Sequence, residues 1–184
     1  MIRYYITDRH PLGGPQALLD SIARNLASGV EYIQIREKDL PPRELAALVR
    51  AALILRGPRP TRILVNTRAD IAIACHADGV HLPSDSPILD YRIPGFLTAV
   101  STHSIDDLRH AQHAGASFAV YGPVFPPFSK SHAAPAAGLD ALQLACASVS
   151  LPVFALGGLT AENAPACIAA GAAGIAAITL FQSP

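Results

Sequence analysis

Residues 31–39 read Glu31-Tyr32-Ile33-Gln34-Ile35-Arg36-Glu37-Lys38-Asp39, and the rest of the sequence is organised around them. The pattern predicts a β-strand, with Ile33 and Ile35 on one face and Gln34, Arg36 and Lys38 on the other. Either the polar face meets water, or the strand is buried and this face lines an anion site. Same-face neighbours stand roughly 6–7 Å apart, so three such donors could hold a ligand as long as a pyrophosphate.

The composition limits the class of protein. The 184 residues predict one domain over 1–184 with a sizeable core. Fourteen basic and 14 acidic residues create no general field for nucleic acid or an anionic membrane, so any anion site must be local. No apolar run has the length of a membrane span, and no signal-peptide pattern precedes the first strand. The widely spaced Cys75, Cys146 and Cys167 are typical of buried free thiols, which predicts a cytoplasmic protein.

Strand and helix patterns alternate along the whole chain. Strands are predicted at Tyr4–Thr7, around Ile33 and Ile35, and at Ile63–Val65, Gly79–Leu82, Phe96–Ser101, Phe118–Tyr121, Pro152–Leu156 and Ile175–Leu180. Helices are predicted at Pro15–Ala27, from Pro42 until Gly57-Pro58, and at Ala69–Cys75, Ile105–Ala114, Leu139–Ala147 and Ala161–Ala170, with little helix between Pro83 and Pro94.

Eight strands separated by helices predict an α/β fold with a parallel sheet, most simply a closed (β/α)8 TIM barrel. Because the chain ends at Pro184, we expect a compact barrel with little or no final helix. Apolar barrel surface left bare there would suit a homodimer. A doubly wound open sheet is the alternative, but no G-x-G-x-x-G follows the first strand.

In a barrel the loops after the strands form one rim, where the chemistry sits. Nearly every predicted strand ends in polar residues or glycine: Thr7-Asp8, Arg36 and Lys38, Asn66, His81, Ser101-Thr102-His103, Tyr121-Gly122, Gly157-Gly158 and Thr179. A solvent-exposed rim would also be polar, so no single polar strand end indicates a site. The evidence for a site is that nearly all the strand ends are polar and converge on one rim. His81 and His103 are candidates to contact a ligand, although a structural role is the commoner one for a histidine.

Two loops are candidate binding loops. Gly157-Gly158 precedes a helix start with Thr160 as its expected cap, and matches the usual barrel phosphate site. A plain tight turn requiring positive φ explains these glycines equally well. The proline-rich loop from Gly122 carries Ser129 and Lys130 near its tip, either to bind a ligand or, for Lys130, to be solvated.

With these residues in place, the chain resembles the thiamine phosphate synthase and TenI-type thiazole tautomerase family. The resemblance runs in order through Y-I-T-D at 5–8, Y-I-Q-I-R-E-K at 32–38, L-V-N at 64–66, A-D-G-V-H-L at 77–82, S-T-H-S at 101–104, Y-G-P-V-F-P at 121–126, Ser129-Lys130 and A-L-G-G-L-T-A-E-N-A at 155–164. Each string is ordinary, but their order and spacing are specific. The family fold is a (βα)8 barrel.

The resemblance implies a transferase of thiamine biosynthesis that joins hydroxymethylpyrimidine pyrophosphate to thiazole phosphate and releases pyrophosphate. It implies that the pyrimidine pyrophosphate is held by Gln34, Arg36, Lys38, Asn66 and Lys130, with Ser101 beside the reacting centre. The thiazole phosphate would be held by Ser129, Gly158 and the Ile178-Thr179 backbone. Arg36, Lys38, Ser101 and Lys130 are then the catalytic candidates, because preorganised cations stabilise a departing pyrophosphate.

The chain departs from the family pattern where Mg²⁺ would bind. Thr67 and Ser86 stand in place of two aspartates, so we expect no protein metal ligands there and a weakened Mg²⁺ requirement, unless Asp85 or Asp8 compensates. A thiazole tautomerase needs no metal, but Pro123 replaces the family's acid–base histidine, which leaves His81 or His103. A non-catalytic phosphate-ligand binder is the third alternative.

Overall fold

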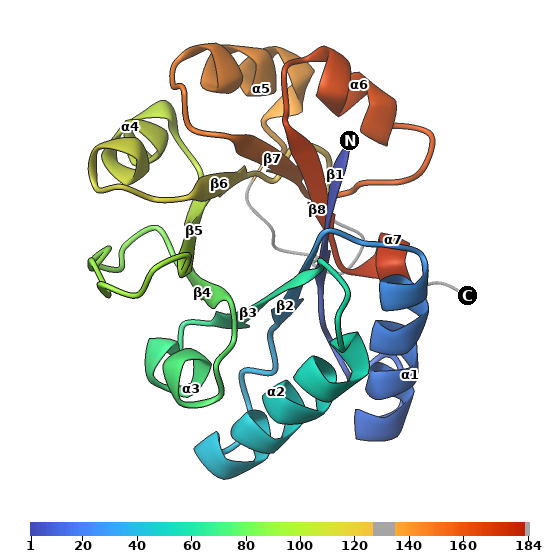
Figure 1. Ribbon diagram of the computed structural model, residues 1–184. Coiled ribbons are helices and arrows are strands. Elements are labelled where there is room, and N and C mark those ends of the chain that lie inside the picture. Colours follow the sequence, from blue (N-terminus) through green and yellow to red (C-terminus); the bar gives the residue numbers. More distant parts are fainter. Residues whose placement is uncertain (127–134, 183–184) are drawn as a thin grey trace.

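Eight parallel strands close into a barrel in the computed structural model, which describes residues 1–126 and 135–182 (Figure 1). The strands are β1 Ile2–Ile6, β2 Tyr32–Ile35, β3 Arg62–Asn66, β4 Gly79–Leu82, β5 Leu97–Thr102, β6 Phe118–Tyr121, β7 Val153–Leu156 and β8 Gly174–Ala177. Each strand pairs with the next, and β8 pairs with β1 through the register Tyr4↔Ala176. This closure confirms the predicted barrel and excludes the open sheet.

The helices form a ring outside the strands (Figure 1). They are α1 Pro15–Ala27, α2 Pro42–Arg56, α3 Ala69–Ala74, α4 Ile105–His113, α5 Gly138–Ala147, α6 Ala164–Ala169 and α7 Thr179–Gln182. Between β4 and β5, residues 83–96 contain no helix, as the sequence predicts. Proline explains part of this, because it cannot donate the backbone hydrogen bond that a helix interior requires.

The barrel has an apolar interior and a separate apolar layer under the helices. Tyr4, Leu64, Phe118 and Phe154 belong to the interior cluster, where the rings of Phe118 and Phe154 stack 4.7 Å apart. Ile33 and Ile35 of β2 belong instead to the layer beneath α1 and α2. Since neighbouring side chains on a strand alternate, Gln34 points into the barrel.

The strand β2 is shorter than predicted. It ends at Ile35, so Arg36 and Lys38 lie beyond it, and the expectation of one continuous strand from 31 to 39 is wrong. The reason is a bond to a residue at the end of β1: the Arg36 backbone N–H donates to Thr7 Oγ1 (2.9 Å). This bond to a side chain takes the place of a ladder bond between strands, and the chain then enters a turn that contains Lys38.

The C-terminal end of the barrel also differs from the prediction. The strand β8 ends at Ala177, and Thr179 begins the short helix α7 instead of extending the strand to Leu180. Phe181 packs against Tyr5, with ring centroids 6.0 Å apart, and its carbonyl accepts from Asn25 Nδ2 (2.8 Å). These contacts cover apolar surface at the place where we expected it to be bare.

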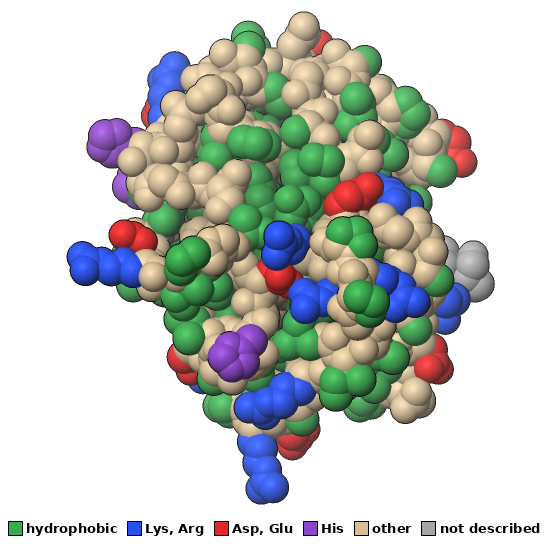
Figure 2. Space-filling model, viewed as in Figure 1, with side chains coloured by type: hydrophobic (Ala, Val, Ile, Leu, Met, Phe, Trp, Pro, Cys, Tyr) green, Lys and Arg blue, Asp and Glu red, His purple; other side chains and the backbone are tan. Residues whose placement is uncertain are grey.

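Basic and acidic side chains are interspersed on the face of the molecule in Figure 2, with apolar side chains between them. Within residues 1–126 and 135–182, no helix is long and apolar enough to cross a membrane.

Candidate active site

Four polar side chains from four strands form one hydrogen-bonded chain inside the barrel. Gln34 Nε2 lies 3.1 Å from Tyr4 Oη and 2.8 Å from His81 Nδ1, and Tyr4 Oη lies 3.0 Å from the same nitrogen. His81 Nε2 lies 2.9 Å from Ser101 Oγ. Tyr4, Gln34 and His81 are buried, whereas Ser101 is partly exposed. The chain therefore runs from the apolar interior up to Ser101.

Burial keeps the His81 ring neutral. Desolvation, and secondarily the nearby Arg36 charge, lower the pKa of His81 to about 3. The Gln34 amide nitrogen can only donate, so His81 Nδ1 accepts and the ring proton sits on Nε2. That N–H donates to Ser101 Oγ, which leaves the Ser101 hydroxyl proton for another acceptor. His81 is thus buried, and Ser101 connects its Nε2 to the rim, while its contact with a ligand stays a prediction.

The two predicted cations follow β2 on the rim. Arg36 is partly exposed and lies close enough to His81 for its charge to lower the pKa of that ring. Lys38 is exposed in the turn after β2. The structure therefore places Gln34 and Arg36 on the same, inner side of the chain, with Gln34 buried below Arg36.

Two other predicted residues lie at the carboxyl ends of β3 and β5. Asn66 is the last residue of β3 and follows the interior Leu64 by one alternation, which directs it to the inner face. His103 lies just beyond β5, and its Nδ1 donates to the Gly122 carbonyl oxygen (2.7 Å). His103 therefore ties the loop after β5 to the start of the proline-rich loop after β6.

The glycine turn after β7 is tightly packed. Gly157 (φ 102°) and Gly158 (φ 58°) both adopt backbone conformations that other residues rarely use. A Cβ on Gly157 would lie 2.6 Å from Pro123 Cβ, so the loops after β6 and β7 have no room for a side chain. The carbonyl oxygens of both glycines bond within the protein. The Gly157 oxygen accepts from the Phe125 backbone N–H (3.1 Å), and the Gly158 oxygen accepts from Asn163 Nδ2 (2.9 Å).

The expected helix cap in this loop is placed differently. Thr160 and Asn163 bond reciprocally, through the Thr160 N–H to Asn163 Oδ1 (2.9 Å) and the Asn163 N–H to Thr160 Oγ1 (3.2 Å). The helix α6 starts only at Ala164, so the cap position belongs to Asn163. The end of β8 lies on the same rim, where Ile178 packs against the barrel interior and Thr179 starts α7. Ser129 and Lys130 lie outside the described residues.

The described residues do not fit the magnesium ion that the family pattern implies. Within residues 1–126 and 135–182, no three His, Cys, Asp or Glu side chains are grouped to hold a metal ion. Thr67 and Ser86 supply no carboxylate, and the expected substitute Asp85 is exposed. The Asp8 carboxylate accepts from the His10 backbone N–H (3.2 Å) at the end of β1.

Sequence reasoning missed several residues that support this rim. Tyr4 completes the buried chain, and Arg9 and Glu37, together with the predicted rim residue Thr7, fix the loop that carries Arg36 and Lys38. The alternation in β1 was an available signal, because it places Tyr4 and Ile6 on one face. Nothing in the sequence pairs Arg9 with Glu37, since 28 positions separate them.

Comparison with known proteins shows the family of the chain. A family model described as thiamine monophosphate synthase matches residues 3–181. A relative from Geobacter sulfurreducens is 43% identical over 180 residues, covering 96% of this chain and 84% of its own length. Thiamine-phosphate synthase from Chlorobium luteolum is 40% identical over 173 residues, covering 90% and 82%. Thiamine phosphate pyrophosphorylase from Pyrococcus furiosus superposes with a TM-score of 0.86 at 30% identity, covering 99% and 88%.

Proposed function

Because the chain belongs to the thiamine monophosphate synthase family, we propose that it joins hydroxymethylpyrimidine pyrophosphate to thiazole phosphate and releases pyrophosphate. One observation carries this proposal beyond the family relationship. The buried chain from Tyr4 through Gln34 and His81 ends at Ser101 on the rim, where the Arg36 charge also lies. A polar, preorganised site next to a cation suits a reaction whose leaving group is an anion.

The proposed roles of the described residues follow from the positions of their side chains. Arg36 and Lys38 neutralise the departing pyrophosphate beyond the end of β2, and Asn66 at the end of β3 donates a hydrogen bond to it. Ser101 donates its hydroxyl proton to an acceptor on the pyrimidine substrate, because its oxygen already accepts from His81 Nε2. We place Lys130 with the cations and Ser129 with the thiazole phosphate on the family resemblance alone.

The thiazole phosphate is assigned to the rim between β7 and β8. The Gly157 and Gly158 carbonyls bond inside the protein, and we propose that the loop presents its N–H groups to the phosphate together with the Ile178-Thr179 backbone. The missing carboxylates at Thr67 and Ser86 lead us to propose a weaker Mg²⁺ requirement than the family pattern implies.

The structure also bears on the tautomerase alternative. His81 is buried, its pKa is about 3, and both of its ring nitrogens have partners, so it is a poor acid–base group at neutral pH. His103 fits this role better, because its Nδ1–H donates to Gly122 and leaves Nε2 as the basic nitrogen. A His103→Gln variant would then lose thiazole isomerisation but keep transfer.

Activity assays with both substrates test the proposal. Purified protein is incubated with the two substrates, once with Mg²⁺ and once with EDTA, and thiamine phosphate and pyrophosphate are measured. Both products should appear together in equal amounts. Isomerisation of the thiazole phosphate alone would favour the tautomerase, and binding of both substrates without turnover would favour a non-catalytic binder.

The setting of this reaction is also a proposal. We place it in the cytoplasm, which suits the free Cys75, Cys146 and Cys167. A homodimer stays a prediction, and the size of the protein in solution tests it. Exposed apolar residues on the outer helices, among them Ile54 and Leu55 on α2, are candidates for such an interface.

A further inference from the structure

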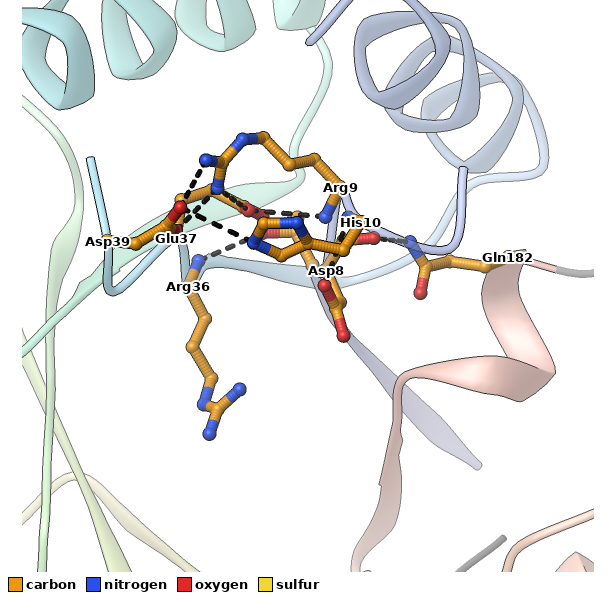
Figure 3. Close-up of polar contacts among 8 residues, drawn as sticks. Asp8, Arg9, His10, Arg36, Glu37, Asp39 and Gln182 are labelled. Atoms are coloured by element: carbon orange, nitrogen blue, oxygen red, sulfur yellow. Dashed lines mark hydrogen bonds and ion pairs between the residues drawn. The ribbon is translucent and has the colours of Figure 1, made fainter. Parts of the chain in front are cut away.

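We propose that Arg9 and Glu37 are positioning residues that hold Arg36 and Lys38 in place to bind pyrophosphate. This inference rests on the function proposed above. Neither residue belongs to the predicted binding set, and the geometry directs both side chains away from the Arg36 guanidinium (Figure 3). Their effect on the ligand would therefore be indirect, through the backbone of residues 36–39.

Glu37 is a carboxylate in the middle of a proposed anion site, which needs an explanation. Only 1% of its side chain is exposed, and it is held from two sides. Thr7 Oγ1 donates to Glu37 Oε1 (2.6 Å) and accepts from the Arg36 backbone N–H (2.9 Å). Glu37 thereby fixes the hydroxyl that holds Arg36, and its own charge lies on the side of the chain opposite to the Arg36 side chain.

Arg9 clamps the chain on both sides of Lys38. Its Nη1 donates to Glu37 Oε2 (3.1 Å) and to Asp39 Oδ1 (2.6 Å), and its Nη2 pairs with Asp39 Oδ2. The Arg9 backbone N–H also donates to Glu37 Oε2 (3.2 Å). The planar fork of a guanidinium suits this task, because it can bind two carboxylates in a fixed geometry.

The arrangement separates the charges of the loop into two groups. Arg9 compensates the Glu37 and Asp39 carboxylates, with His10 Nε2 a further 3.4 Å neighbour of Asp39. Figure 3 shows the Arg36 side chain extending away from this group. The loop that carries Arg36 and Lys38 is thus held in place before an anion binds, which lowers the entropic cost of binding.

Binding of inorganic pyrophosphate, measured by titration calorimetry, tests the inference. Arg9→Met should weaken binding about tenfold, since small displacements of binding groups have effects of this size or larger. Arg9→Lys keeps the positive charge but loses the planar guanidinium, and should reduce the pyrophosphate affinity less than Arg9→Met does. Glu37→Gln should also weaken pyrophosphate binding. The matched control is Arg3→Met, which removes an arginine–glutamate pair from the amino ends of β1 and β2. It should leave pyrophosphate binding unchanged.

Kinetics and a double-mutant cycle distinguish the proposed positioning role of Arg9 from a role in stability alone. The Arg9 variants should raise KM for the pyrimidine pyrophosphate but not for the thiazole phosphate. In a Lys38→Met background, Arg9→Met should add little to the loss of affinity, because both changes act on the same contact. If wild type binds pyrophosphate and Arg9→Lys and Glu37→Gln bind it equally well, the inference is overturned and the function stands. If wild type itself does not bind pyrophosphate, the proposed function fails, and this inference fails with it.

Discussion

An arginine–glutamate ion pair links β1 to β2 at each end of these two strands. The two ion pairs differ in how deeply they are buried. At the amino ends, Arg3 Nε lies 3.2 Å from Glu31 Oε2, with 30% and 41% of the side chains exposed. At the carboxyl ends, Arg9 and Glu37 are joined at 3.1 Å with exposures of 13% and 1%. Exposed pairs contribute about 0–1 kcal/mol, whereas losing one partner of a buried pair costs about 3–5 kcal/mol.

This difference follows the division of labour in a parallel barrel. The amino ends of the strands serve stability, and the carboxyl ends carry the site. At the amino end, the Asp78 carboxylate accepts from Arg56, Arg62 and the Ile63 backbone N–H in one cluster. At the carboxyl end, the ion pairs of Arg9 hold the loop that carries Arg36 and Lys38. Four predictions test this contrast between the ends, beginning with the largest expected effect.

Filling the glycine turn at the carboxyl end should be the most damaging change. In Gly158→Ala the new Cβ would overlap the Pro126 carbonyl oxygen and lie 2.8 Å from Phe125 Cβ. We expect a loss of about 3 kcal/mol in the free energy of unfolding, combining overlap and positive φ. The control is Gly115→Ala at the amino end, which also has positive φ (82°) but meets no atom within 4 Å. Urea unfolding should show a loss of only about 1 kcal/mol for the control.

Removing a rim cation should weaken anion binding far more than removing a cation from the opposite end. We expect Arg36→Ala or Lys38→Ala to reduce pyrophosphate affinity about 10–100-fold, the value of a charge-assisted hydrogen bond. Arg62→Ala, which removes an Asp78 partner at the amino end, should leave the affinity unchanged. Equal affinities for all four proteins in calorimetry would show that the rim cations do not bind this ligand.

The buried His81 should make stability depend on pH. Its folded pKa of about 3 lies below the unfolded value of 6.5, so the unfolded state binds more protons between these values. The free energy of unfolding should be at its full value above pH 6.5 and fall toward pH 3, by at most roughly 1.4 kcal/mol per pH unit.

Unfolding curves at pH 7, 6 and 5 for wild type and His81→Asn measure this dependence. The variant should lose the His81 contribution to the slope. The exposed His76 at the amino end supplies the control, and His76→Asn should keep the wild-type slope. A slope that His81→Asn does not change would contradict a buried neutral ring.

Thr67 should be the position with the smallest effect. It has φ 59°, a conformation that a β-branched residue rarely adopts and that Asn and Asp tolerate better. Both Thr67→Asn and Thr67→Asp should therefore stabilise the fold, by about 1 kcal/mol. Only Thr67→Asp adds a carboxylate, so only it should gain a thermal shift from Mg²⁺ in the presence of pyrophosphate. If the two variants respond to Mg²⁺ alike, the carboxylate at this position does not bind metal.

Much of this fold follows from periodicity alone. The helix at Pro15–Ala27 and the strands at Gly79–Leu82 and Phe118–Tyr121 have the predicted bounds, because their apolar spacing is regular. Errors occur at element ends, where bonds to distant residues decide. The strand β2 stops because Arg36 bonds to Thr7, and β8 stops because α7 begins at Thr179.

The candidate site divides in the same way. Polar residues at strand ends predicted Asn66 and Ser101 as rim residues, since parallel strands bring their carboxyl ends together, and alternation predicted that Gln34 lies opposite Ile33 and Ile35. The pattern could not show that His81 is buried with both ring nitrogens occupied, because this depends on partners from three other strands.

By itself, the sequence determined the barrel, the face on which Gln34 lies, and the membership of the family, because alternation and motif order are local properties of the chain. Only the tertiary structure decided how the charges at 36–39 are divided. Glu37 and Lys38 are neighbours in sequence, and their opposite environments arise because Arg9 approaches from the end of another strand. An ion pair between segments distant in sequence has no local signature, so the packing of the barrel alone selects it.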